Sequence, residues 1–234
     1  MRNSWSKGLT KETNASLLKT SNTMKERGLD NFRAWRDQMK AEGKIKSSYE
    51  PLEQCGDLAE LIGVVLGDGH IYRHDRCESL RITGDSQKLG FVNYTADLVE
   101  RIFKRTPTVR KVTASNAMTV TIYEKQISQR LGIPVGSRSQ LNYQLPEWIS
   151  ANQEYQIHFL RGLYEAEGTL AFHAGTYTHK FIFSNANEFL LNLVMDLVAG
   201  LGYHPHYSYR KIQVSKKAEV QKLADLLQFR SYET

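Results

Sequence analysis

The chain has 234 residues, a formal net charge of +6 and a pI near 9.2. This length allows one large domain or two small ones, and no apolar run is long enough to cross a bilayer. With two cysteines outside any zinc-ligand spacing and no apolar leader, we expect a cytoplasmic protein (prokaryote or phage) or one of an organellar matrix, neither secreted nor bound to a membrane.

The first 50 residues are basic and helical in pattern. They hold 11 Lys and Arg against 6 Asp and Glu, whereas the rest of the chain carries a net charge of only +1. Thr10 suits the N-cap of a helix that ends near Gly28, and NFRAWRDQMKAEG predicts a second amphipathic helix. We expect residues 1–50 to be a helical extension and linker, which either binds a polyanion or is a solvated basic tail.

Beyond residue 50 the sequence contains an internal repeat. ELIGVVLGDGHIY ends a helical pattern at Asp68, and HFLRGLYEAEGTLAF does so at Glu167, 99 residues later. After each acid the chain repeats the order strand, strand, helix, strand, strand, helix. Two copies of this size predict two fused halves, residues 51–145 and 146–234, related by a pseudo-twofold axis.

The predicted strands alternate apolar and polar residues, as half-buried strands do. Val120 and Ile122 alternate with threonines, and Ile212 and Val214 alternate with polar residues. Each half should therefore be α+β, with an antiparallel sheet that buries one face under its helices. The other face either binds base edges of nucleic acid or is merely solvated. The candidate DNA-binding residues on it are Arg81, Thr83, Thr119, Thr121, His173, Lys180, Lys211 and Gln213.

Small residues lie four positions apart on the two helices that precede the acids. A residue with little or no side chain lets another backbone approach closely. We therefore expect these two helices to pack on each other and to bring Asp68 and Glu167 together near the axis. The small residues of this predicted interface are Gly63 and Gly67 in the first half, and Gly162 and Ala166 in the second.

Two carboxylates at the C-terminal ends of packed helices repel each other and the helix dipoles. A divalent cation relieves this repulsion, and carboxylate oxygens suit Mg²⁺. Such a cation beside a phosphate predicts metal-assisted phosphodiester hydrolysis. The alternative is that each acid only caps a turn, but the matching positions of Asp68 and Glu167 in the repeat argue against it.

LIGVVLGDG and FLRGLYEAEG resemble the two motifs of LAGLIDADG homing endonucleases, in their single-chain, two-motif form. The resemblance covers residues of about 55 to 230, and LGIPVGSRS followed by LPEWI is similar to the linker of the family. The first motif departs from the usual form at Leu66 and Gly67. The resemblance implies two pseudo-symmetric αββαββα halves, with saddle-shaped antiparallel sheets over the DNA major groove and the motif helices as their interface.

The resemblance also implies an activity. It describes an intron-encoded, monomeric, site-specific endonuclease that cuts both strands of a long double-stranded DNA target and leaves short 3′ overhangs. The cofactor implied is Mg²⁺ or Mn²⁺, with Ca²⁺ as a non-catalytic substitute. The implied metal ligands are the catalytic carboxylates of Asp68 and Glu167 and the backbone carbonyls of Gly67 and Ala166.

The family also places a basic or polar residue near each scissile phosphate, at the end of the last strand of each half. In this sequence Lys125 and Lys217 lie at about that place and are our candidates, with Gln126 and Lys216 as competitors. The alternative is that both are solvated lysines at the start of a helix.

WSKGLTKET resembles a short nuclease-associated DNA-binding motif, which implies that Lys7 and Lys11 contact DNA. The alternative is that residues 1–50 only pack on the rest of the chain. Two other functions fit the same scaffold: an RNA maturase that binds its host intron RNA, and a non-cleaving DNA-binding protein. Retention of both Asp68 and Glu167 favours the nuclease.

Overall fold

The structure is a computed structural model that describes residues 6–30, 32–46, 48–113, 115–230 and 232. The chain divides into two compact units, Met1–Tyr49 and Glu50–Thr234. Within the described ranges no helix combines the length and the apolar character that a membrane crossing requires.

The first unit contains α1 (Ala15–Glu26) and α2 (Arg33–Ala41), and neither helix buries a side chain. The N-cap of α1 is Asn14, whose side chain accepts hydrogen bonds from the backbone N–H groups of the next turn. Thr10 instead forms a preceding turn with Thr13. The helix therefore begins later than the sequence analysis predicted, because Asn14 caps it better than a threonine already engaged in a turn.

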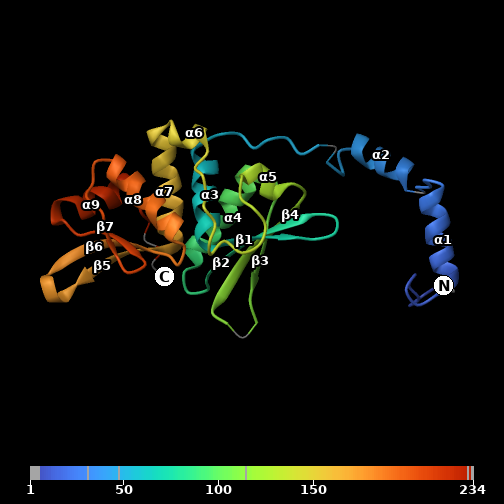
Figure 1. The fold of residues 1–234 in the computed structure, drawn as a ribbon, viewed down its shortest axis with the longest axis horizontal. Coiled ribbons are helices and arrows are strands. Elements are labelled where there is room, and N and C mark those ends of the chain that lie inside the picture. Colours follow the sequence, from blue (N-terminus) through green and yellow to red (C-terminus); the bar gives the residue numbers. More distant parts are fainter. Residues whose placement is uncertain (1–5, 31, 47, 114, 231, 233–234) are drawn as a thin grey trace. The chain divides into compact units, whose positions relative to one another are not determined.

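The second unit begins with the first αββαββα half. Its sheet has the strand order β1-β2-β4-β3, and each neighbouring pair is antiparallel (Figure 1). The predicted order of elements is confirmed. They are α3 (Gly56–Asp68), β1 (Gly69–Arg73), β2 (Glu78–Asp85), α4 (Leu89–Phe103), β3 (Thr108–Lys111), β4 (Ala117–Glu124) and α5 (Ile127–Leu131).

The second half repeats this topology, with the strand order β5-β6-β8-β7. A short helix, α6 (Glu147–Ser150), precedes it, and a 3₁₀ turn, Ala174–Thr176, joins its first two strands. Its elements are α7 (Gln153–Glu167), β5 (Gly168–His173), β6 (Thr178–Ser184), α8 (Glu188–Gly200), β7 (His206–Ser208), β8 (Lys211–Val214) and α9 (Lys217–Leu226).

One face of each sheet forms the core. Val120 and Ile122 of β4 and Ile212 and Val214 of β8 are buried, as their alternation predicts. Helix α4 packs on β2 and β4, while α8 and α9 pack on the strands of the second sheet. The polar residues of the strands therefore share the face opposite the helices, which we call the polar sheet face.

Helices α3 and α7 join the two halves and lie side by side (Figure 1). A methyl group added to Gly63 would meet the carbonyl oxygen of Phe159, and one added to Gly162 would meet that of Glu60. The two contacts are equivalent, because each pair of positions is related by the 99-residue offset. Glycine is required at both positions because backbone lies where a side chain would stand.

Candidate active site

The acids of the two motifs are the last residues of α3 and α7, so both lie where the packed helices end. A methyl group on Gly67 would lie 2.5 Å from the Cβ of Ala166 and 3.3 Å from the Cγ of Glu167. The interface thus brings Gly67 and Ala166 together, and the negative charge of Glu167 acts on Asp68.

Both carboxyls are costly to ionise. Burial, followed by the charge of Glu167, raises the pKa of Asp68 to about 7, although Arg138 and Lys88 oppose this shift. Burial also raises the pKa of Glu167, again opposed by Arg138. A pair of carboxylates under this strain favours a bound cation.

Each acid lines its own cleft. The Asp68 cleft has a volume of about 850 Å³ and contains Asp68, Lys88, Glu165, Thr169 and Arg230 among its lining residues. Thr83, a predicted DNA-binding residue, also lines it.

The Glu167 cleft is smaller, at about 360 Å³, and contains His70, Arg138, Glu167 and Asn187. Several of its residues correspond to lining residues of the Asp68 cleft by the 99-residue offset, as His70 does to Thr169 and Asn187 to Lys88. The two clefts are therefore counterparts under the pseudo-twofold relation.

The structure does not bring Lys125 or Lys217 to either cleft. Strand β4 runs antiparallel to β2, so that Ala117 pairs with Asp85 near the Asp68 cleft and Glu124 pairs with Glu78 at the opposite end. Lys125 follows that distant end and is exposed. In the second half Lys211 pairs with Ser184, so Lys217 follows the equivalent distant end of β8. The competitors Gln126 and Lys216 are also exposed, and Lys216 pairs with Glu219 at 3.3 Å.

The basic residues at the clefts are instead Lys88, Arg138 and Arg230. Lys88 precedes α4, while Arg138 and Arg230 lie in the segments that follow the last helix of each half. Strand and helix periodicity carries no signal for such positions. For Arg138 alone the sequence offered a signal, because this residue lies within LGIPVGSRS, the segment that is similar to the linker of the family.

Arg138 is held by the end of α3. Its guanidinium donates to the carbonyl oxygens of Val65 and Gly69, and the side-chain amide of Asn187 donates to the carbonyl of Arg138 at 2.8 Å. A cation at this helix end offsets both the helix dipole and the adjacent acids.

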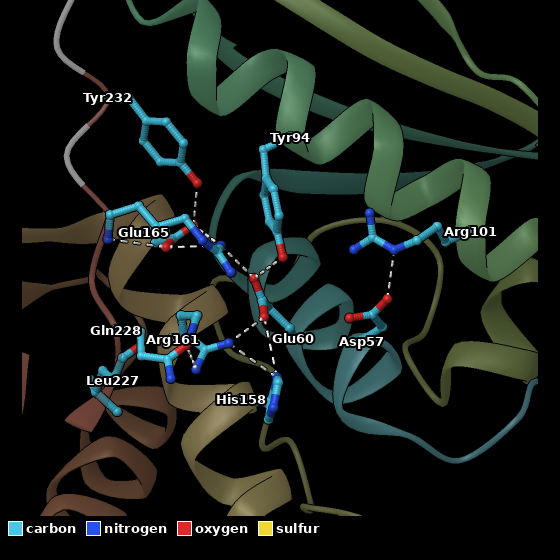
Figure 2. Close-up of polar contacts among 11 residues, drawn as sticks. Asp57, Glu60, Tyr94, Arg101, His158, Arg161, Glu165, Leu227, Gln228 and Tyr232 are labelled. Carbon is cyan, nitrogen blue, oxygen red and sulfur yellow. Dashed lines mark hydrogen bonds and ion pairs between the residues drawn. The ribbon is translucent and has the colours of Figure 1, made fainter. Parts of the chain in front are cut away.

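A second group of charged residues lies between the helices, beside the Asp68 cleft (Figure 2). The fully buried carboxylate of Glu60 accepts hydrogen bonds from Tyr94 at 2.6 Å, Arg230 at 2.7 Å, Arg161 at 3.2 Å and His158 at 3.3 Å. Burial alone would raise the pKa of Glu60, but the hydrogen bonds from His158, Arg230 and Tyr94 outweigh it and lower the pKa to about 2. The sequence carries no local signal for this group, because its members lie up to 170 residues apart.

The predicted DNA-binding residues of the strands lie on the polar sheet faces. Arg81 pairs with Thr121 and Thr83 with Thr119, on the face opposite Ile82. Thr121 is the least accessible of them, at 8% exposed. In the second half the polar face includes His173, Lys180, Lys211 and Gln213. Their contact with DNA stays a prediction.

No family model matches the sequence. The replication factor C small subunit of Methanocaldococcus jannaschii is 27% identical over an alignment of 130 residues, and the match covers 50% of this chain. The matching part is only 7% of the length of that protein.

Solved structures match over most of the chain. A structure of mesophilic variants of the homing endonuclease I-DmoI is 18% identical, with a TM-score of 0.53 over 76% of this chain and 98% of that one. I-DmoI in complex with DNA and Mn is 17% identical, with a TM-score of 0.51 over 75% and 98%. The N-terminal LAGLIDADG domain of DUF199/WhiA is 13% identical, with a TM-score of 0.54 over 75% and 83%. The chain therefore has the LAGLIDADG fold, with both copies of the αββαββα unit in one polypeptide.

Proposed function

We propose that the chain is a metal-dependent, site-specific endonuclease that hydrolyses one phosphodiester bond in each strand of a double-stranded DNA target. The observation that carries this proposal is the placement of Asp68 and Glu167 at adjoining helix ends, each in one of two equivalent clefts. Two equivalent clefts in one chain suit two antiparallel strands, so the enzyme acts as a monomer. I-DmoI, which has this fold, is described as a homing endonuclease and was solved with DNA and Mn.

The donor set fits Mg²⁺ or Mn²⁺. The described residues contain no cluster of three or more His, Cys, Asp or Glu that could enclose a metal ion. Two carboxylates, with the backbone carbonyls of Gly67 and Ala166 as further donors, suit a hard cation that completes its shell with water and phosphate oxygens. When bound, such a cation polarises the scissile phosphate and activates the attacking water.

Three basic residues of the clefts supply fixed positive charge. Lys88 and Arg230 in the Asp68 cleft, and Arg138 in the Glu167 cleft, face the position of a phosphate whose negative charge grows during hydrolysis. The polar sheet faces bind the duplex on either side. The exposed Lys7 and Lys11 of the extension add to the cationic surface for DNA.

The fold alone does not decide between cleavage and binding, since the WhiA domain shares it and its name specifies no cleavage. The two acids are what favours a nuclease. An RNA maturase or a non-cleaving DNA-binding protein has no need for two strained carboxylates in paired clefts.

A selection followed by a cleavage assay tests the proposal. The full chain is incubated in Ca²⁺ with a library of randomised duplexes, and the retained duplexes are sequenced and then treated with Mg²⁺. We expect both strands of the selected duplex to be cut. Asp68→Asn and Glu167→Gln should bind this duplex without cutting both strands, whereas Asp97→Asn, at an exposed acid of α4, should cut normally. Tight binding without cleavage in Mg²⁺ or Mn²⁺ would refute the nuclease.

A further inference from the structure

The two clefts have similar backbones but differ at several pairs of equivalent positions, and at one of these pairs an acid in one cleft corresponds to an apolar residue in the other. Glu165 lines the Asp68 cleft, whereas its counterpart by the 99-residue offset, Leu66, lines the Glu167 cleft. Only one cleft therefore has this additional carboxylate.

Glu165 is bound to the arginine of its cleft. Its side chain is fully buried, and its two oxygens accept from Nη1 of Arg230 at 3.0 and 2.9 Å. The hydroxyl of Tyr232 donates to Glu165 at 2.7 Å, which fixes the carboxylate from a second side (Figure 2).

Arg230 is held rigidly but is not enclosed. Nη1 also donates to Glu60 at 2.7 Å, and the guanidinium lies over the ring of Tyr94, 3.8 Å from its centre. The side chain is nevertheless 28% exposed and lines the Asp68 cleft. A guanidinium has five N–H donors, so with Nη1 bound to carboxylates the groups at Nη2 and Nε can meet an anion in the cleft.

The arginine of the other cleft is held differently. Arg138 is bound to the backbone carbonyls of Val65 and Gly69, and the side chain at the position of Glu165 is the apolar Leu66. Removal of the Glu165 charge therefore leaves the support of Arg138 intact.

We infer that Glu165 is a positioning residue that orients the Arg230 guanidinium toward the scissile phosphate in the Asp68 cleft, and that it serves the cleavage of one DNA strand only. The inference rests on the proposed nuclease function. Glu165→Gln removes the charge that holds Arg230 but retains Glu60 as its second anchor. Loss of a residue that orients a group at the reaction site reduces activity by about tenfold to a hundredfold, so this variant should become a strand-specific nicking enzyme.

The test measures the two strands separately. The duplex selected in Ca²⁺ carries a different fluorophore on each strand, and single-turnover rates are measured in Mg²⁺. We expect Glu165→Gln to slow one strand by about tenfold or more and to leave the other within about twofold. Tyr232→Phe should slow the same strand by less, and Arg138→Met should slow the opposite strand. Glu154→Gln, at an exposed acid in the first turn of the same helix, is the matched control and should change neither rate. Equal slowing of both strands by Glu165→Gln would overturn the inference.

A second measurement does not depend on cleavage. The ¹⁵N relaxation of the Arg230 Nε–H group, assigned by its loss in Arg230→Lys, reports how rigidly the guanidinium is held. We expect this group to be ordered in the wild type and mobile in Glu165→Gln. The measurement is made at a temperature at which thermal melting curves show that both proteins are folded. If Glu165→Gln does not fold, Tyr232→Phe replaces it, and the same strand should be slowed and the same Arg230 group loosened, each to a smaller extent. A wild type that binds but does not cut refutes the proposed nuclease, whereas an equally ordered Arg230 in the variant refutes the positioning role.

Discussion

Replacing Asp68 with Asn should increase the free energy of unfolding of the metal-free protein, and the gain should grow with pH. Folding raises the pKa of Asp68 from 3.8 to about 7, mainly through burial and then through the charge of Glu167. An unfolded chain ionises this carboxyl at a lower pH than the folded chain does. The wild type therefore loses stability as the pH rises through this range, and the full loss is present above about pH 7.

The size of the effect follows from the shift. Each pKa unit corresponds to about 1.4 kcal/mol, so the shift of Asp68 amounts to at most about 4 kcal/mol above about pH 7. Of this, about 2 kcal/mol accumulates between about pH 5.5 and pH 7. Asparagine has nearly the same shape and no charge, so Asp68→Asn should recover most of it.

Urea unfolding in EDTA at about pH 5.5, 7 and 8.5 measures the difference between wild type and variant. Millimolar Mg²⁺ should stabilise the wild type more than Asp68→Asn, because in the proposed site the Asp68 carboxylate binds the cation. Asp97→Asn, at an exposed acid of α4 that lines neither cleft, serves as the matched control. A destabilising Asp68→Asn, or an effect on the free energy of unfolding that is the same at all three pH values, would refute the raised pKa of Asp68.

Three further predictions concern the helix interface, the buried Glu60 and the basic residues. Gly63→Ala should lower the free energy of unfolding by about 3 kcal/mol, because the added methyl group meets backbone atoms of α7. Gly200→Ala is the control and should be neutral or slightly stabilising, because a methyl group there has nothing within 4 Å. Urea unfolding of the two variants measures the difference. Glu60→Gln should cost about 3 kcal/mol at neutral pH. Because folding lowers the pKa of Glu60 from 4.5 to about 2, this difference should shrink as the pH falls from 4.5 toward 2; acid unfolding curves that stay parallel would contradict it. Lys88→Met should slow cleavage of the selected duplex by about tenfold or more, while Lys125→Met should stay within about twofold. If Lys125→Met slowed cleavage as much as Lys88→Met in the strand-resolved assay, the lysine that follows β4 would again be a candidate for the cleavage site.

The fold was predictable because its signals are local. Two such signals can be recognised in the sequence even though the two halves differ. They are the alternation of Val120 and Ile122 with threonines and the four-residue spacing of Gly63 and Gly67. The same spacing predicted that α3 and α7 pack closely, and hence that their final acids lie near each other.

The basic residues of the clefts were not predictable in the same way. Their position depends on which end of a strand approaches the helix interface, and the antiparallel pairing of β4 with β2 places the end before Lys125 far from Asp68. A periodic pattern fixes the face on which a side chain lies but does not fix the end of the sheet that meets the cleft. Arg230, a loop residue distant in sequence from both Glu60 and Asp68, has no periodic signal at all.

The buried charges also explain why one chain carries both halves. Glu60 is stabilised by His158 and Arg161 of the other half, whose counterparts in its own half are Ala59 and Ile62. Two identical first halves packed through α3 would bury two Glu60 carboxylates against these apolar side chains. Each would keep the hydrogen bond from Tyr94 of its own half but would have no cation beside it, and a buried charge without a counter-charge costs several kcal/mol. The unlike halves satisfy each other, so Glu60 favours their pairing within one molecule. Once the halves are fused, equivalent positions are free to differ. The two clefts therefore have different chemistry on similar backbones: Glu165 is equivalent to Leu66, and Lys88 is equivalent to Asn187.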